Sequence, residues 1–258
     1  MPQTKIVFFD IDGTLIDMQA KKITPKMLET LHRLQDRGIK ICIATGRSPM
    51  VLPKIDGVAF DAYLTFNGSL CYDRKGVIFS NPIPHKDVVR FIQNAAALGR
   101  PVCVSTIGRL AANGTDTDLT DYFFIANEPV PVVDDFDAVC AEDIYQLMLG
   151  CRPKDYPALL DGAPGAKIAA WWDRAVDVIP AGGGKGIGIE KMLAYYGLDK
   201  AEALAFGDGN NDREMLQAVG TGVAMENGSP ELKALADEIC GPVYEDGIYH
   251  YCADKGLI

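Results

Sequence analysis

Short apolar runs alternate with stretches of helical periodicity in the first part of the chain. Residues 5–9 and 40–44 are nearly continuous apolar runs, which are typical of strands buried on both faces of a parallel sheet. Between them, Thr24 and Pro25 are residue types favoured at a helix N-terminus, and apolar residues follow at helical spacing. A third strand is predicted at residues 62–65. This alternation predicts a parallel sheet with right-handed crossovers.

The same alternation returns in the last part of the chain, and a different pattern separates the two parts. The C-terminal part predicts helices at 186–196, 212–219 and 230–236, and strands at 203–206 and 221–224. The middle predicts helices at 86–98 and 153–160, and antiparallel strands at 102–106, 144–149, 167–172 and 175–180. We therefore predict a doubly wound, Rossmann-like α/β core built from residues 1–81 and 182–258. Residues 82–181 are predicted to be an inserted α+β cap domain.

The composition of the chain excludes some classes of partner and indicates the cellular compartment. The chain of 258 residues carries 25 Lys and Arg against 35 Asp and Glu, a formal net charge of −10. This balance argues against binding to nucleic acid or to an anionic membrane, because both require a basic surface. No stretch approaches the ~18 apolar residues of a membrane span. The seven scattered cysteines contain no C-x-x-C pair, so we expect free thiols and a cytoplasmic protein. We expect a monomer or a weak homodimer.

Polar residues follow the predicted strands where a ligand site is expected. They are Asp10 and Asp12 after the first strand, Thr45 after the second, Lys185 at a helix start, and Asp208, Asn211 and Asp212 after residues 203–206. Ligands of open α/β sheets bind beyond the carboxyl ends of the strands, so these residues should meet there. Carboxylates in one crevice require a cation, and oxygen ligands favour Mg²⁺. A lysine and a hydroxyl group beside that cation suit a phosphoryl group.

These motifs, in this order, resemble those of the haloacid dehalogenase-like superfamily, and the inserted middle segment resembles that of the Cof-type phosphatases. The resemblance implies Mg²⁺-dependent hydrolysis of a small phosphorylated metabolite, such as a sugar phosphate, through an aspartyl-phosphate. Asp10 would attack phosphorus. Asp12 would protonate the leaving group and later deprotonate the attacking water.

The resemblance also implies roles for the other motif residues. Mg²⁺ would be held by Asp10, Asp208 and the backbone carbonyl of Asp12. The phosphoryl group would be bound by Thr45, Gly46, Lys185 and Asn211. Asp212 would contact and orient these groups without binding the metal or the phosphate directly. Arg47 and Asn67 follow strands at the same edge of the sheet. Each could contact the leaving group or serve only to stabilise its loop.

Other interpretations of the same residues remain open. A phosphomutase or phosphotransferase would use the same intermediate, and a non-catalytic regulator would only bind a phosphorylated ligand. The paired Asp10 and Asp12 argue against the regulator, because binding alone requires neither carboxylate. Residues 103–109 match the C-x₅-R pattern of cysteine-dependent phosphatases, whose loop opens a helix. Here a strand or turn follows, so Cys103 is predicted to be a buried thiol.

Overall fold

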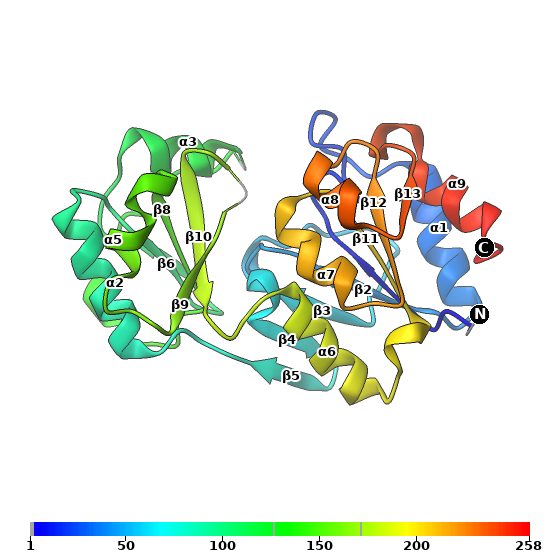
Figure 1. The fold of residues 1–258 in the computed structure, drawn as a ribbon, viewed down its shortest axis with the longest axis horizontal. Coiled ribbons are helices and arrows are strands. Elements are labelled where there is room, and N and C mark those ends of the chain that lie inside the picture. Colours follow the sequence, from blue (N-terminus) through cyan, green and yellow to red (C-terminus); the bar gives the residue numbers. More distant parts are fainter. Residues whose placement is uncertain (1–2, 126, 171) are drawn as a thin grey trace. The chain divides into compact units, whose positions relative to one another are not determined.

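The computed structural model describes residues 3–125, 127–170 and 172–258, which form two compact units (Figure 1). The first unit contains the residues up to Arg47, Pro53–Ser80 and Gly184–Ile258, and the second contains Ser48–Leu52 and Asn81–Gly183. The assignment of these units to a catalytic core and a cap domain stays a prediction. Within the described ranges, no helix is both long enough and apolar enough to cross a membrane.

An eight-stranded sheet forms the centre of the first unit, in the order β13-β12-β11-β1-β2-β3-β4-β5. Its strands are β1 (Ile6–Phe9), β2 (Lys40–Ala44), β3 (Ala62–Thr65), β4 (Leu70–Asp73), β5 (Gly76–Ser80), β11 (Ala203–Gly207), β12 (Thr221–Met225) and β13 (Glu238–Cys240). The strands from β13 to β3 are parallel, and β4 and β5 continue the sheet as an antiparallel hairpin. β1 therefore lies between β2 and β11.

Helices cover both faces of this sheet (Figure 1). One face carries α6 (Lys185–Tyr196), α7 (Arg213–Gln217) and α8 (Pro230–Leu235), and the other carries α1 (Pro25–Asp36) and α9 (Gly247–Asp254). On the first face, Phe8 shares a buried cluster with Met192 of α6. On the second face, Phe9 stacks on Phe206 with ring centroids 5.5 Å apart, and Phe206 meets Tyr251 of α9 edge-on at 5.4 Å. The doubly wound α/β core predicted from the sequence is confirmed.

Local sequence explains the elements that lead to the sheet edge. All four residues of β1 are fully buried, as expected for a central strand covered on both faces. At the start of α1, the backbone N–H of Met27 donates to Thr24 Oγ1 at 3.1 Å, and Pro25 occupies the first helical position. The chain leaves α1 through Gly38, whose φ is +74°. These capping residues fix the length of the connection between β1 and β2.

A five-stranded antiparallel sheet forms the centre of the second unit, in the order β7-β6-β8-β10-β9. Its elements are α2 (His85–Ala97), β6 (Cys103–Ser105), β7 (Leu110–Ala112), α3 (Thr117–Ile125), α4 (Phe136–Val139), β8 (Gln146–Gly150), α5 (Tyr156–Leu160), β9 (Ala166–Ala169) and β10 (Ala175–Pro180). Val104, Leu147 and Val178 are paired on adjacent strands and share a buried cluster with Phe91 of α2. This α+β fold agrees with the one predicted for the inserted segment.

Several elements differ from those predicted. The hairpin of β4 and β5 and the helices α3, α4 and α9 were not expected from the periodicity of the sequence. The strand predicted at 167–172 ends at Ala169, and residue 171 lies outside the described ranges. The helix predicted at 212–219 is present as α7 but ends two residues earlier, and a 3₁₀ turn, Asn210–Asp212, precedes it. In this turn Asp212 accepts the backbone N–H groups of Asp208 and Gly209, both at 3.0 Å.

Candidate active site

The polar residues selected from the sequence meet where the central parallel strands end. Phe9 of β1 is level with Ile43 of β2 and with Phe206 of β11. Asp10 therefore emerges at the same edge of the sheet as the residues that follow the two neighbouring strands. The order of strands along the chain reverses on the two sides of β1, which is where open α/β sheets place their ligand sites.

Lys185 connects two carboxylates inside this edge. Its Nζ lies 2.6 Å from Asp10 Oδ1 and 2.5 Å from Asp212 Oδ1, and its side chain is fully buried. Lys185 is the first residue of α6, which follows the inserted segment in the sequence. The chain thus returns to the first unit, where Lys185 contacts the residue after β1. Two buried negative charges thus share one buried positive charge.

The three carboxylates of this cluster carry more negative charge than Lys185 neutralises. Burial raises the pKa of Asp10 well above its usual value, the charges of Asp212 and Asp208 raise it further, and Lys185 opposes them. Burial, followed by the charge of Asp212, raises the pKa of Asp208 to about 7. Burial lowers the pKa of Lys185, but the charges of Asp10 and Asp212 outweigh it and raise this pKa above the ordinary value. Lys185 is therefore cationic and does not neutralise all three carboxylates.

Asp10, Asp208 and Asp212 offer carboxylate oxygens that all lie within 4.8 Å of one another. Oxygen donors at such a spacing suit a divalent cation such as Mg²⁺. Both oxygens of Asp212 already accept hydrogen bonds, from Lys185 and from the N–H groups of Asp208 and Gly209. Asp10 and Asp208 are thus the better placed donors, and Asp212 holds the lysine and the turn around Asp208.

The loop after β1 (residues 10–16, the β1 loop) is shaped to contact Asp208. Gly13 has φ +86°, and a Cβ at this position would lie 2.2 Å from Asp208 Oδ2, so no larger residue fits. Thr14 Oγ1 donates to Asp208 Oδ1 at 3.0 Å. Asn227, which no sequence pattern singled out for this site, donates from Nδ2 to the Gly13 carbonyl at 2.8 Å. The β1 loop and the residue after β11 are therefore fixed against each other.

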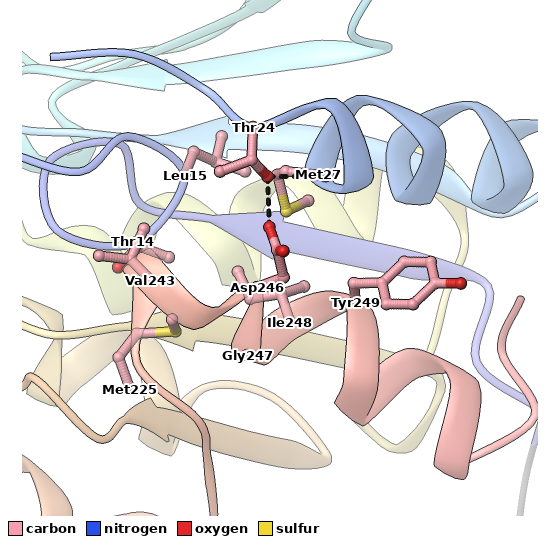
Figure 2. A pocket seen from close by; sticks show the side chains of 10 residues that line it. All are labelled: Thr14, Leu15, Thr24, Met27, Met225, Val243, Asp246, Gly247, Ile248 and Tyr249. Carbon is pink, nitrogen blue, oxygen red and sulfur yellow. Dashed lines mark hydrogen bonds between the residues drawn. The ribbon is translucent and has the colours of Figure 1, made fainter. Parts of the chain in front are cut away.

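A small cavity lies beside Thr14, between the β1 loop, α1 and the start of α9 (Figure 2). It is lined by Thr14, Leu15, Thr24, Met27, Met225, Val243, Asp246, Gly247, Ile248 and Tyr249. Its volume of about 10 Å³ is the space of about one water molecule. Thr24 Oγ1 donates to Asp246 Oδ1 at 2.5 Å on its lining (Figure 2). A metabolite does not fit in a cavity of this size.

Asp12 lies apart from the buried cluster and forms an ion pair with Arg47. Arg47 Nε donates to Asp12 Oδ2 at 2.8 Å, and Nη2 donates to Oδ1 at 2.6 Å. Both side chains are 32% exposed, in contrast with buried Asp10. The hydrogen bond to Asp12 is the main reason that the pKa of Arg47 is raised. The bidentate contact fixes the direction of the Asp12 carboxylate.

A second group of residues in mutual contact consists of Thr45, Gly46, Asn67 and Asn211. Thr45 is 1% exposed, and its Oγ1 accepts the backbone N–H of Arg47 at 3.1 Å. Asn211 Nδ2 donates to Asn67 Oδ1 at 3.2 Å. A Cβ on Gly46 would lie 3.1 Å from Asn67 Nδ2, so the Asn67 amide lies directly over this glycine. The residues expected after β2, β3 and β11 are thus in contact.

Cys103 does not have the surroundings of a reactive thiol. It is the first residue of β6 and fully buried, and the strand β7 follows where a phosphate-binding helix would be required. Burial raises the pKa of Cys103 to about 12, so the thiolate is disfavoured. All seven cysteines, each within the described part of the chain, are free and buried.

Known proteins share this architecture over nearly the whole chain. The family model of the haloacid dehalogenase-like hydrolases matches residues 7–252. The chain is 34% identical over 257 residues to the putative phosphatase YkrA of Bacillus subtilis (strain 168), and the match covers 99% of each protein.

Solved structures agree with this match. BT1666 of Bacteroides thetaiotaomicron, a phosphatase of the same superfamily, has a TM-score of 0.92 and 31% identity, over 99% of this chain and 96% of that one. The subclass IIB sugar phosphatase BT4131 has a TM-score of 0.89 and 29% identity, over 99% of this chain and 100% of that one. The predicted enzyme class, a phosphoric monoester hydrolase, is confirmed by these matches. The chain belongs to the haloacid dehalogenase-like hydrolase family, as its four motifs indicate.

Proposed function

We propose that this protein is a Mg²⁺-dependent phosphatase that hydrolyses small phosphorylated metabolites, such as sugar phosphates, through an aspartyl-phosphate on Asp10. The observation that carries the proposal is the buried contact of Asp10 with Lys185, 2.6 Å long, beside the carboxylates of Asp208 and Asp212. This arrangement combines a nucleophile, a fixed cation and a place for a divalent ion. The similarity to the sugar phosphatase BT4131 supports the substrate class.

The first half of the proposed reaction transfers the phosphoryl group to the protein. Lys185 holds Asp10 Oδ1, and Oδ2 is the oxygen that is proposed to attack. Oδ2 forms a bond to phosphorus as the ester P–O bond breaks in line. Asp12 donates its proton to the departing oxygen, so the product leaves as a neutral alcohol. Thr45, Gly46, Lys185 and Asn211 are proposed to bind the phosphoryl oxygens.

The second half returns Asp10 to its starting state. Asp12, now a carboxylate, takes a proton from a water molecule whose oxygen attacks phosphorus. The bond between phosphorus and Asp10 breaks, and inorganic phosphate leaves. Mg²⁺, held by Asp10, Asp208 and the backbone carbonyl of Asp12, would neutralise negative charge on the phosphoryl group when bound. The ion pair with Arg47 holds the Asp12 carboxylate in one direction during this second step, when Asp12 is ionised.

The remaining assignments complete the proposal. We assign the first unit as the catalytic core and the second as the cap domain, which is inserted between Thr45 and Lys185 in the sequence. A cytoplasmic location, and a monomeric or weakly dimeric state, remain predictions from the sequence. A phosphomutase and a non-catalytic regulator stay the alternatives, and no contact described above favours either of them.

A phosphate-release screen over a panel of phosphorylated metabolites tests the proposal. We expect release in the presence of Mg²⁺, loss of release with a chelator and in Asp10→Asn, and normal release in Cys103→Ser. Release that resists the chelator, or that survives Asp10→Asn, would overturn the proposal. Steady release in water without an acceptor sugar excludes an obligate mutase. Binding of phosphorylated compounds without turnover across the panel would instead favour a regulator.

A further inference from the structure

The turn after β3 (Phe66–Gly68, the β3 turn) has an unusual backbone. Phe66, Asn67 and Gly68 have φ values of 51°, 52° and 91°, so three consecutive residues are left-handed. Among the described residues, five other than glycine have a positive φ, and two of these five, Phe66 and Asn67, are consecutive in this turn. This conformation is unfavourable for a bulky side chain such as phenylalanine. Contacts with the surroundings must therefore hold the β3 turn in place.

The first set of these contacts is with the loop after β2. The backbone N–H of Phe66 donates to the carbonyl of Arg47, and that of Asn67 donates to the carbonyl of Thr45, both at 3.0 Å. Between these two bonds, the Asn67 amide lies over Gly46, with Nδ2 3.1 Å from the position of a Cβ. The left-handed turn is what brings the side chain of Asn67 to this place.

The second set is with the start of α6, which carries Lys185, and with the turn after β11, which carries Asn211. A Cβ on Gly68 would lie 2.2 Å from the Gly184 carbonyl oxygen and 3.1 Å from the backbone N of Lys185, so the β3 turn packs tightly against the start of α6. Asn211 Nδ2 donates to Asn67 Oδ1 at 3.2 Å. The β3 turn thus contacts all three segments that hold the proposed phosphoryl-binding groups.

We propose that Asn67 is a positioning residue for phosphate, acting through Gly46 and Asn211 rather than by contact with the leaving group. Asn67 is only 3% exposed, so its amide lies behind these residues. The side chain packs against Gly46 on one side and accepts a hydrogen bond from the Asn211 amide on the other. This inference rests on the proposed function, because it concerns the binding of the phosphoryl group that Asp10 receives.

Two variants separate the side chain of Asn67 from its backbone conformation. Asn67→Gly retains the left-handed φ and removes the amide, whereas Asn67→Ala removes the amide and also strains the turn. The probe is inorganic phosphate, titrated calorimetrically in Mg²⁺. We expect Asn67→Gly to bind phosphate about 3- to 10-fold more weakly, the cost of one lost hydrogen bond. Its dissociation constant for Mg²⁺ should remain near that of the wild type, and its melting temperature should fall less than that of Asn67→Ala.

Asn67→Ala should lose the same affinity for phosphate and also melt at a lower temperature. Asp246→Gly is the matched control, because Asp246 has φ 56° and its side chain bonds to Thr24 instead of to a motif residue (Figure 2). We expect this control to bind phosphate normally. In steady-state assays, the KM of Asn67→Gly for a phosphate ester should rise by the same factor as its dissociation constant for phosphate.

Several outcomes would overturn the inference. Normal phosphate binding by Asn67→Gly would mean that only the backbone of the turn matters. An equal loss in Asp246→Gly would mean that phosphate affinity follows the general stability of the fold. If the wild type releases phosphate from esters in Mg²⁺ and Asn67→Gly is unaffected, the inference alone fails. If the wild type neither binds nor releases phosphate, the proposed function fails and the inference fails with it.

Discussion

Replacing Lys185 by methionine removes the positive charge between two buried carboxylates while retaining most of the side-chain volume. Lys185 Nζ lies 2.6 Å from Asp10 Oδ1 and 2.5 Å from Asp212 Oδ1, and the lysine side chain has no exposed surface. Removing one partner of a buried ion pair costs about 3–5 kcal/mol, because the remaining charge is buried without compensation. We expect a loss of this size, which corresponds to a fall of about 6–20 °C in Tm.

Urea unfolding of the metal-free protein, followed by circular dichroism, measures the free energy of unfolding. Lys191→Met is the matched control: Lys191 lies on the same helix, is exposed, and has its Nζ 5.6 Å from the centroid of the Phe79 ring. An exposed substitution of this kind should change the free energy of unfolding by no more than about 1 kcal/mol.

The pH dependence of this loss is a second test of its electrostatic origin. Burial raises the pKa of Asp10, and Lys185 lowers it, so the variant should raise the pKa of Asp10 further. When the pKa of a carboxyl is higher in the folded than in the unfolded state, its destabilising effect grows as pH rises from the unfolded-state pKa to the folded-state pKa and is constant above it. The difference between Lys185→Met and the wild type should therefore shrink in acid. A variant as stable as Lys191→Met at neutral pH, or a loss that does not depend on pH, would refute this reasoning.

Three further predictions follow from the contacts around the site. Arg47→Ala should lower kcat by about 10- to 100-fold, because the Asp12 carboxylate loses its fixed direction, and Arg47→Lys should recover only part of this loss. The fall in kcat should be smaller for p-nitrophenyl phosphate, whose leaving group needs less protonation. An equal fall in kcat for both kinds of ester would contradict the proposed role of Arg47 in orienting Asp12. Gly13→Ala should abolish Mg²⁺ binding in calorimetry, because its Cβ would lie 2.2 Å from Asp208 Oδ2, whereas Gly38→Ala, at a similar φ with no atom within 4 Å of its Cβ, should only lower stability. Mg²⁺ at about 100 times its Kd should stabilise the protein by about 2.7 kcal/mol and raise Tm by about 5–10 °C. This rise should decrease as pH falls below 7, because burial raises the pKa of Asp208 to about 7 and its protonated form does not bind Mg²⁺; a rise that persists in Asp208→Asn would contradict the site.

The proximity of Asp10 and Asp208 could be predicted from the sequence because it follows from strand geometry. Apolar runs identify the parallel strands, and the carboxyl ends of such strands converge at one edge. The hairpin of β4 and β5 was harder to predict, because β5 is an edge strand with much exposed surface and its apolar pattern is weak.

Contacts that depend on tertiary packing could not be derived from spacing. The ion pair between Arg47 and Asp12 joins side chains 35 residues apart whose directions depend on two loops. Asn67 and Gly68 are typical turn residues, but the left-handed conformation of Phe66 opposes its local preference. Only the packing of this turn against α6 and against the loop after β2 explains that conformation. Asn227 likewise gains its contact with the Gly13 carbonyl through the fold alone.

Detection of a phosphoryl group on Asp10 tests the central claim most directly. The protein is mixed with Mg²⁺ and a phosphate ester, quenched in acid, digested, and analysed by mass spectrometry. We predict that the peptide that contains Asp10 carries one phosphoryl group and that this group is absent in Asp10→Asn. With p-nitrophenyl phosphate, whose leaving group needs little protonation, the modified fraction should increase in Asp12→Asn, because the second step still needs the base. Continued ester hydrolysis by Asp10→Asn, with no phosphoryl group on this peptide in the wild type, would contradict the account.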